Sequence, residues 1–322
     1  MPTPPDDARV YTLADLGAWE KIRPGLPPSL AVLGHPVAHS VSPQMHNAAL
    51  AELAKKHPQL KDWRYFKFDI ESADFQSAAN LLSNKNFVGV NLTVPHKVIG
   101  LTVAIGKENT LRIGATNTLV HNPESKWDGY NTDGFGLVRA LKNDLDFELN
   151  GSQVILLGAG GAARATAVQC LDSGCAKIWI GSRDELRRRK LIEDLNDQRV
   201  SGFFLDAPAN ISQFEAPNLL VINATPVGLN DSEQPNYINF LSSGRKLFDM
   251  TYIGGDKTKF VKKAIDVGLR ATDGLNMLIW QGAKSLTIWL KAQEGIDIQP
   301  ESIAQTMMNA ACDTLGQPHR HA

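Results

Sequence analysis

The segment VNLTVPHK at residues 90–97 combines the apolar pattern of a buried strand with side chains that could bind a polar ligand. Pro95 has no amide proton and interrupts the strand, and Lys97 follows directly after this break. Asn91 and Thr93 are two positions apart, so in a strand they point to the same face. That polar face is either a solvated sheet edge or one wall of a pocket.

Polar residues also follow the other predicted strands in this part of the chain. Ser40 and Ser42 come after the apolar run at 29–34. The runs 115–121 and 127–133 suggest a hairpin, with Asn117 in the first run and Asp133 at the end of the second. In open parallel sheets, ligands bind beyond the carboxyl ends of the strands, so these side chains could converge on one pocket.

Each of these residues also has a purely structural explanation. Ser42 could cap the helix that begins near Pro43. Asn117 could serve only a turn, and Asp133 could cap the helix that follows it. Lys97, taken alone, is typical of a surface lysine whose stem covers apolar surface.

A glycine-rich turn, GAGGAA at 158–163, lies between an apolar strand and a helical pattern. Gly158 permits a tight turn, Gly160 lets backbone amides approach a pyrophosphate, and the small Ala163 lets helix and strand pack closely. The helix N-terminus supplies positive potential to the phosphates. In this context the motif predicts a dinucleotide site, although a turn without a ligand would have the same pattern.

The next predicted strand ends in SRDELR at 182–187, where an NAD enzyme would usually carry an acidic residue. Arg183 and Arg187 favour NADP, because a guanidinium can stack on adenine and bind a 2′-phosphate. Asp184 would repel that phosphate, so NAD is possible as well. Asp184 and Arg187 could also be no more than a solvated helix start.

Short apolar runs alternate with helical patterns along most of the chain, which indicates an α/β protein with mostly parallel sheets. The helical stretch 275–293 is apolar on all sides, so we expect it to be buried, against the first unit of the chain. The second domain would then be inserted into the first. Residues 1–28 are expected to form a loosely attached N-terminal arm.

Composition excludes several classes of protein. Lys plus Arg number 33 against 34 for Asp plus Glu, which gives no basic surplus for nucleic acid or an anionic membrane. No apolar run approaches the roughly 20 residues of a membrane helix, and residues 1–9 do not have the apolar stretch that is typical of a signal peptide. The 3 cysteines form no CxxC pair, and the histidines fit no metal-ligand pattern, so no metal site is predicted. We expect a cytoplasmic protein.

Several motifs together resemble the shikimate dehydrogenase family. They are GHPVAHSVSPQMHNAAL, VNLTVPHK, GATNTLV, GYNTDGFG, LLGAGGAARA, INATPVGL, FDMTY and DGLNMLIWQGA, in the order of that family and over about residues 30–315. The resemblance implies reversible reduction of 3-dehydroshikimate to shikimate with NADPH, in aromatic amino-acid biosynthesis. It also implies a substrate-binding domain at 29–133 plus 275–322 and a Rossmann-type NADP-binding domain at 134–274.

The resemblance assigns roles to individual positions of this sequence. It makes Lys97 and Asp133 the catalytic pair. The expected substrate-binding residues are Ser40, Ser42, Asn91, Thr93, Asn117, Tyr252 and Gln281. The expected cofactor-binding residues are Gly158, Ala159, Gly160, Gly161, Ala162, Ser182, Arg183, Arg187, Met250 and Gly274. The chain departs from the family where Ser182 and Asp184 replace the common Asn and Thr, and where Asn276 replaces a common glycine.

Hydride transfer to a ketone builds negative charge on its oxygen, so the site needs a positioned proton donor. The Lys97 ammonium could supply that proton, and Asp133 would hold the lysine in place and favour its charged form. A quinate, dual quinate/shikimate or aminoshikimate dehydrogenase would use the same scaffold. A non-catalytic NADP-binding sensor would be expected to lack Lys97 or Asp133. The sequence leaves both a monomer and a homodimer open.

Overall fold

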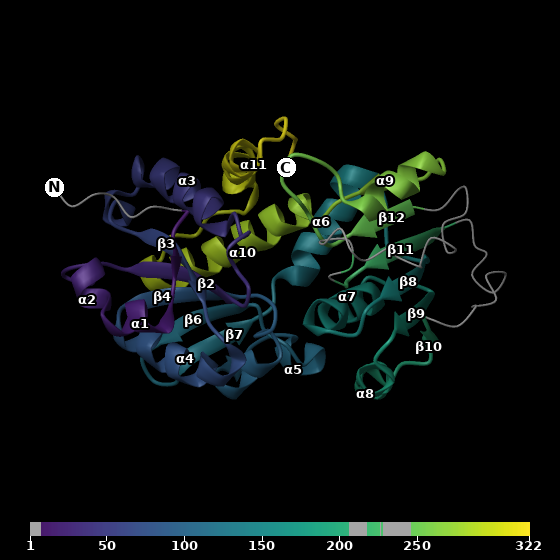
Figure 1. Cartoon of the computed structure of the whole chain (residues 1–322), viewed down its shortest axis with the longest axis horizontal. Coiled ribbons are helices and arrows are strands. Elements are labelled where there is room, and N and C mark those ends of the chain that lie inside the picture. Colours follow the sequence, from purple (N-terminus) through teal and green to yellow (C-terminus); the bar gives the residue numbers. More distant parts are fainter. Residues whose placement is uncertain (1–7, 206–217, 226, 228–245) are drawn as a thin grey trace. The chain divides into compact units, whose positions relative to one another are not determined.

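The computed structural model describes residues 8–205, 218–225, 227 and 246–322, which form two compact units. The first unit is Met1–Thr132 with Gly282–Ala322, and the second is Asp133–Gln281. Figure 1 draws the first unit in purple, blue and yellow and the second mainly in teal and green. Residues 1–7 of the predicted arm, and Pro226, Gly228 and Leu229 of the INATPVGL motif, lie outside the described residues.

The first unit is built on a mixed sheet with the order β1-β3-β2-β4-β6-β7-β5. Its strands are β1 (Val10–Tyr11), β2 (Ser29–Gly34), β3 (Arg64–Asp69), β4 (Phe87–Leu92), β5 (Ile105–Gly106), β6 (Thr118–Asn122) and β7 (Lys126–Tyr130). β1 to β4 pair in parallel, whereas β6 is antiparallel to both β4 and β7. The hairpin predicted around residues 115–133 is therefore confirmed, and the carboxyl ends of β2, β3 and β4 share one edge.

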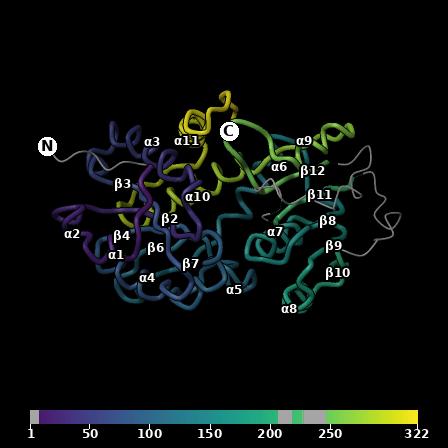
Figure 2. The backbone as a smooth tube through the Cα atoms, in the orientation of Figure 1, coloured from purple at the N-terminus to yellow at the C-terminus, as the bar shows by residue number. Residues whose placement is uncertain are grey.

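Helices cover this sheet. They are α1 (Leu13–Gly17), α2 (Trp19–Ile22), α3 (Ser42–Ala54), α4 (Phe75–Asn84), α5 (Thr110–Ile113) and α11 (Glu301–Leu315), together with α10 (Leu275–Glu294) from Gly282 onward and short 3₁₀ turns at Pro58–Leu60, Ser72–Asp74 and Ile99–Thr102. α3 and α11 pack against each other, as Figures 1 and 2 show. The N-cap of α3 is Val41 with no side-chain cap, so the expectation that Ser42 caps this helix is wrong.

Strand β4 is buried on both faces, which explains its composition. Val90 and Leu92 point into a core shared with Phe75 and Leu82 of α4. Asn91 faces the opposite side and is also buried. Alternation therefore separates an apolar side of β4 from a polar one, and the polar side faces other parts of the protein instead of water.

The segment after residue 7 is not a loosely attached arm, contrary to the expectation from the sequence. β1 pairs in parallel with β3, and Tyr11, Leu16 and Trp19 are at most 2% exposed. The Trp19 ring lies 4.9 Å from the Phe66 ring, centroid to centroid, in an edge-to-face arrangement. Burial of these large apolar side chains stabilises the unit, so the segment is part of its core.

The second unit contains a parallel sheet with the order β10-β9-β8-β11-β12-β13. Its strands are β8 (Gln153–Leu157), β9 (Lys177–Ser182), β10 (Val200–Phe204), β11 (Leu219–Asn223), β12 (Lys246–Asp249) and β13 (Arg270–Thr272). Its helices are α6 (Asp133–Leu145), α7 (Gly161–Asp172), α8 (Glu185–Leu195), α9 (Lys259–Asp266) and α10 as far as Gln281. Counted within the unit, the strand order is 3-2-1-4-5-6. This is the order of doubly wound dinucleotide-binding domains, whose ligand crevice lies between strands 1 and 4.

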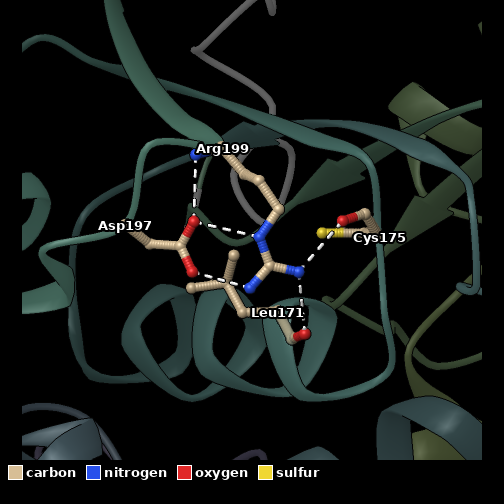
Figure 3. Close-up of polar contacts among 4 residues, drawn as sticks. All are labelled: Leu171, Cys175, Asp197 and Arg199. Carbon is tan, nitrogen blue, oxygen red and sulfur yellow. Dashed lines mark hydrogen bonds and ion pairs between the residues drawn. The ribbon is translucent and has the colours of Figure 1, made fainter.

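Arg199 anchors the far end of helix α7 in this unit (Figure 3). Its guanidinium donates to the carbonyl oxygens of Leu171 and Cys175, both at 3.2 Å, and pairs with the carboxylate of Asp197 at 2.6 Å. The hydrogen bond and charge of Asp197 raise the pKa of Arg199. The Leu171 carbonyl also accepts from the Gly174 amide at 3.1 Å, and Cys175 lies beyond the helix, so the arginine ties the last turn of α7 to the loop that follows it.

Candidate active site

Ser40 lies in the connection between β2 and α3, and Ser42 is the first residue of α3, at the carboxyl edge of the first sheet. The Ser40 hydroxyl donates to the Ser42 hydroxyl at 3.1 Å and accepts from the Ser42 amide at 3.3 Å. The amide of Ser40 donates to the carbonyl of Val37 at 3.0 Å and closes a tight turn. The two predicted substrate-binding serines are therefore held together as one pair of hydroxyls.

Asn91 and Asn117 meet in a buried hydrogen-bond network on the same unit. Asn91 accepts from the Tyr65 hydroxyl at 2.8 Å and donates to the Asn117 carbonyl at 3.1 Å and to the Ser285 hydroxyl at 3.1 Å. Burial raises the pKa of the Tyr65 phenol, so this group stays protonated and acts as a donor. Internal partners thus occupy and orient the Asn91 side chain.

The side chain of Asn117 fixes the chain immediately before Asp133. Its Oδ1 accepts from the amide of Thr132 at 2.9 Å, and its Nδ2 donates to the Thr132 hydroxyl at 3.0 Å. The hydroxyls of Thr118 and Ser285 lie 2.8 Å apart and complete the network. Every member is at least 94% buried, so its polar groups need these partners.

Thr93 and Lys97 lie in the loop that follows β4, and both are half-buried. The amide of Thr93 donates to the Leu33 carbonyl at 2.9 Å, which ties the loop to the end of β2. The Lys97 carbonyl accepts from the amide of Thr116 at 2.8 Å. The backbone of Lys97 is thereby anchored next to Asn117, as expected if the strand ends converge.

Asp133 is the first residue of α6 and is 3% exposed. A carboxylate in the first turn of a helix is stabilised by the positive end of the helix dipole. The backbone of α6 at Gly136 lies close against Met277 and Gln281 of α10, so Gln281 is beside the first turn of α6. Asp133 and Gln281 belong to the second unit and Lys97 to the first, and the pairing of Lys97 with Asp133 stays a prediction.

The glycine-rich turn between β8 and α7 has the geometry that a pyrophosphate requires. Gly158 has φ +117°, and a β-carbon there would lie 2.9 Å from the Ala224 carbonyl oxygen at the end of β11. Gly160 is the N-cap of α7, and the position of its missing side chain has no atom within 4 Å. The open space therefore lies at the helix N-terminus, where backbone amides can bind phosphate oxygens. Ala159 lies in this turn, and Gly161 and Ala162 are the first two residues of α7.

Beyond the end of β9, Asp184 has a clear structural role. It is the N-cap of α8, where its carboxylate accepts from the Arg187 amide at 3.0 Å and pairs with the Arg187 guanidinium at 3.1 Å. Its amide donates to the hydroxyl of buried Ser182 at 3.1 Å. Arg183 and Arg187 are exposed, so both can reach a ligand from solvent. The helix start at this position, which the sequence gave as an alternative, is confirmed.

Met250 and Gly274 are held against each other near the end of β12. A β-carbon on Gly274 would lie 2.2 Å from the Met250 carbonyl oxygen, so only glycine fits there. The Met250 sulfur lies 3.7 Å from the Thr166 hydroxyl of α7. Tyr252 follows two residues after Met250 and is half-buried.

A buried acidic residue supports this end of the sheet. Asp249 accepts from Thr258 at 2.6 Å and from the Asn223 amide group at 2.9 Å, and burial raises its pKa. Asn223 ends β11 and Asp249 ends β12, so the pair fixes the two strand ends beside the glycine turn. The motifs around 223 and 249 signalled these residues, but their partnership could not be deduced without the fold.

Comparison with known proteins identifies the relatives of this chain. Residues 32–119 match the shikimate dehydrogenase substrate binding domain. Shikimate dehydrogenase (NADP(+)) from Moorella thermoacetica is 34% identical over 290 residues, which cover 86% of this chain and 93% of the relative. The chain belongs to the shikimate dehydrogenase family.

Solved structures of the family share the fold. Shikimate 5-dehydrogenase from Thermus thermophilus, in complex with NADP(H) and shikimate, has a TM-score of 0.71, with 32% identity over 88% of this chain and 99% of that one. Shikimate 5-dehydrogenase from Listeria monocytogenes, in complex with shikimate and NAD, has a TM-score of 0.72, with 27% identity over 87% of this chain and 96% of that one.

Within this family framework, sequence reasoning missed four members of the polar network. They are Tyr65, Thr118, Thr132 and Ser285. Thr118 lies in the motif GATNTLV and Thr132 in GYNTDGFG, so their position in the sequence could have identified them as site residues. Tyr65 has the type and position of an ordinary strand residue, and Ser285 lies in an apolar helix, 194 positions from Asn91. Neither could be recognised from the sequence as a member of the network.

Two findings concern other kinds of site. Across the part of the chain that the structure describes, no group of three His, Cys, Asp or Glu residues is placed to hold a metal ion. Among the same residues, no helix has the length and apolarity needed to cross a membrane.

Buried His46 has a structural role near the serine pair. Its ring stacks on the Tyr65 ring, with 4.1 Å between the centroids, and its Nδ1 forms a hydrogen bond with the Ser42 carbonyl oxygen at 2.9 Å.

Proposed function

We propose that this protein is an NADP-dependent shikimate dehydrogenase that reversibly reduces 3-dehydroshikimate to shikimate in aromatic amino-acid biosynthesis. The proposal rests on one observation: this member of the family has both a polar site for the substrate and a site for the dinucleotide. A polar network lies at the strand ends of the first unit, and a glycine turn lies at the switch point of a 3-2-1-4-5-6 sheet in the second.

The two units have separate roles in this proposal. The first unit, which contains the matched residues 32–119, binds the substrate, with Ser40 and Ser42 near its carboxylate and Asn91, Thr93 and Asn117 near its hydroxyls. The second unit binds the dinucleotide, and Tyr252 and Gln281 contribute to the substrate site from there. Met250 and Gly274 lie near the nicotinamide. The protein acts in the cytoplasm, as a monomer or a homodimer.

Lys97 and Asp133 carry out the proton transfer. The nicotinamide, when bound, supplies or accepts the hydride. During reduction, Lys97 donates a proton to the carbonyl oxygen and stabilises the negative charge that develops on it. Asp133 holds the ammonium in place and favours its charged form. In the reverse direction, the pair takes the proton from the substrate hydroxyl.

Replacing Lys97 should abolish turnover and leave cofactor binding intact. For Lys97→Ala we expect kcat to fall by about 10²–10⁴-fold, the usual contribution of a general acid. The dissociation constant of NADPH, measured by fluorescence titration, should stay within about twofold because backbone amides of the second unit bind the phosphates. Lys61→Ala removes an exposed lysine from the same unit and is the matched control. Turnover near that of the wild type in Lys97→Ala would contradict the assignment.

The proposed preference for NADP depends on how Asp184 is engaged. Its carboxylate caps α8 and pairs with Arg187, so part of its charge is compensated within the protein. Arg183 and Arg187 are exposed and can both bind a 2′-phosphate. The arginines therefore outweigh the single carboxylate.

Arg183→Ala should raise the KM for NADP by about 10-fold or more, which corresponds to the loss of a charge-assisted hydrogen bond. The KM for NAD should change by less than about twofold, because NAD has no phosphate at that position. Steady-state kinetics with both cofactors measure the two constants. Arg189→Ala, which removes an exposed arginine from α8, is the control. Equal increases in the KM for NADP and the KM for NAD would show that Arg183 does not bind the 2′-phosphate.

Quinate and aminoshikimate are the competing substrates within this family. Ser40, Ser42 and Thr93 favour shikimate, because the extra hydroxyl of quinate requires altered contacts at these positions. A non-catalytic NADP-binding sensor is the alternative from another class, but the chain retains both Lys97 and Asp133.

Initial rates with shikimate, quinate and aminoshikimate, each with NADP and with NAD, test the proposed function directly. We expect the highest kcat/KM with shikimate and NADP, at least about 10-fold above every other combination, which is the discrimination that a single polar contact can provide. A higher value with quinate and NAD would favour a quinate dehydrogenase. Cofactor binding without turnover of any of the three substrates would favour the sensor.

A further inference from the structure

Lys67 is a lysine buried beneath the predicted substrate site. It lies in β3, two residues after Tyr65 and therefore on the same face of the sheet, opposite Val32 of β2. Only 4% of the residue is exposed. Lysine is rarely buried to this degree, because removing an ammonium from water is costly without compensating contacts.

The ammonium of Lys67 contacts the turn that carries the serine pair. It donates to the carbonyl oxygen of Ala38 at 2.9 Å and to that of Ser40 at 3.2 Å. Two carbonyls on either side of His39 are thus tied to one charged group. The backbone of Ser40 therefore has a fixed position relative to β3.

The positive charge of Lys67 affects the pKa of His39, which lies in this turn. The pKa of His39 is lowered first by the partial loss of hydration around its ring and then by the charge of Lys67. The two hydroxyls beyond it, those of Ser40 and Ser42, are neutral groups. A carboxylate bound to two neutral hydroxyls needs positive charge nearby to offset the loss of its hydration.

We propose that Lys67 is a positioning residue that makes the Ser40–Ser42 pair selective for an anionic carboxylate. Its ammonium fixes the serine turn through the carbonyls of Ala38 and Ser40 and provides the positive charge under the carboxylate. This inference rests on the proposed function, because it takes shikimate as the ligand of the serine pair. Lys67 lies outside the motifs that indicate the substrate site.

The test compares a charged with an uncharged substrate. Lys67→Met replaces the ammonium with an apolar group, and Lys67→Gln keeps a hydrogen-bond donor but removes the charge. Lys61→Met, at an exposed position of the same unit, is the control. For each variant, kcat and KM are measured with shikimate and with its methyl ester at saturating NADP, and the dissociation constant of NADP is measured separately.

We expect both Lys67 variants to raise the KM for shikimate about 10-fold with kcat within about threefold, as a lost charge interaction in a low-dielectric site implies. The kcat/KM for the methyl ester should change by less than about threefold in Lys67→Gln, because an ester has no charge to lose. The preference for the carboxylate over the ester would therefore collapse.

Equal losses with the acid and the ester in Lys67→Gln would show that Lys67 only supports the fold, and unchanged constants would show that it has no role. Both results overturn the inference while the wild type still oxidises shikimate, so the proposed function survives them. If Lys67→Met does not fold, Lys67→Gln alone decides the question. A wild type without activity on shikimate overturns the proposed function and this inference together.

Discussion

The hydrogen bonds between Asn117 and Thr132 are the constraint on which the rest of the site depends. They hold the last residue of the first unit in place, and Asp133 is the next residue in the chain. The backbone amide of Thr116, the residue before Asn117, donates a hydrogen bond to the carbonyl oxygen of Lys97. A short path of hydrogen bonds and peptide bonds therefore connects the backbone of the predicted proton donor with that of its predicted carboxylate partner.

The hydrogen bonds between Asn117 and Thr132 hold the chain firmly because the polar groups around them are buried and form hydrogen bonds with one another. Amide and hydroxyl groups from β4, β6 and α10 bind one another within the first unit, at distances of 2.8–3.2 Å. Leaving one such buried group without a partner costs about 1–3 kcal/mol, so alternative arrangements are disfavoured. The network thus gives the strand ends one defined geometry, and it does so with neutral groups that leave the local charge to Lys67, Lys97 and Asp133.

The sequence predicted those features that depend on local pattern. The glycine turn, the helix start at Asp184 and the hairpin before Asp133 each follow from residues close together in the chain. The sequence did not reveal that Tyr11 and Trp19 belong to the core, because a two-residue strand and short helices carry little periodic signal. Ser285 and Lys67 also escaped notice, since their partners are distant in sequence and a buried lysine looks like any other lysine before the fold is known.

We propose that Lys97 and Asp133 form one pair that transfers a proton to or from the oxygen on the reacting carbon of the substrate. A crystal structure of the protein with NADP and shikimate tests it most directly. We expect the Lys97 ammonium to lie about 3 Å from both the Asp133 carboxylate and the substrate hydroxyl that is oxidised, within the reach of proton transfer. Side chains of Lys97 and Asp133 that do not touch each other, or a reacting hydroxyl bound by other residues, would contradict it.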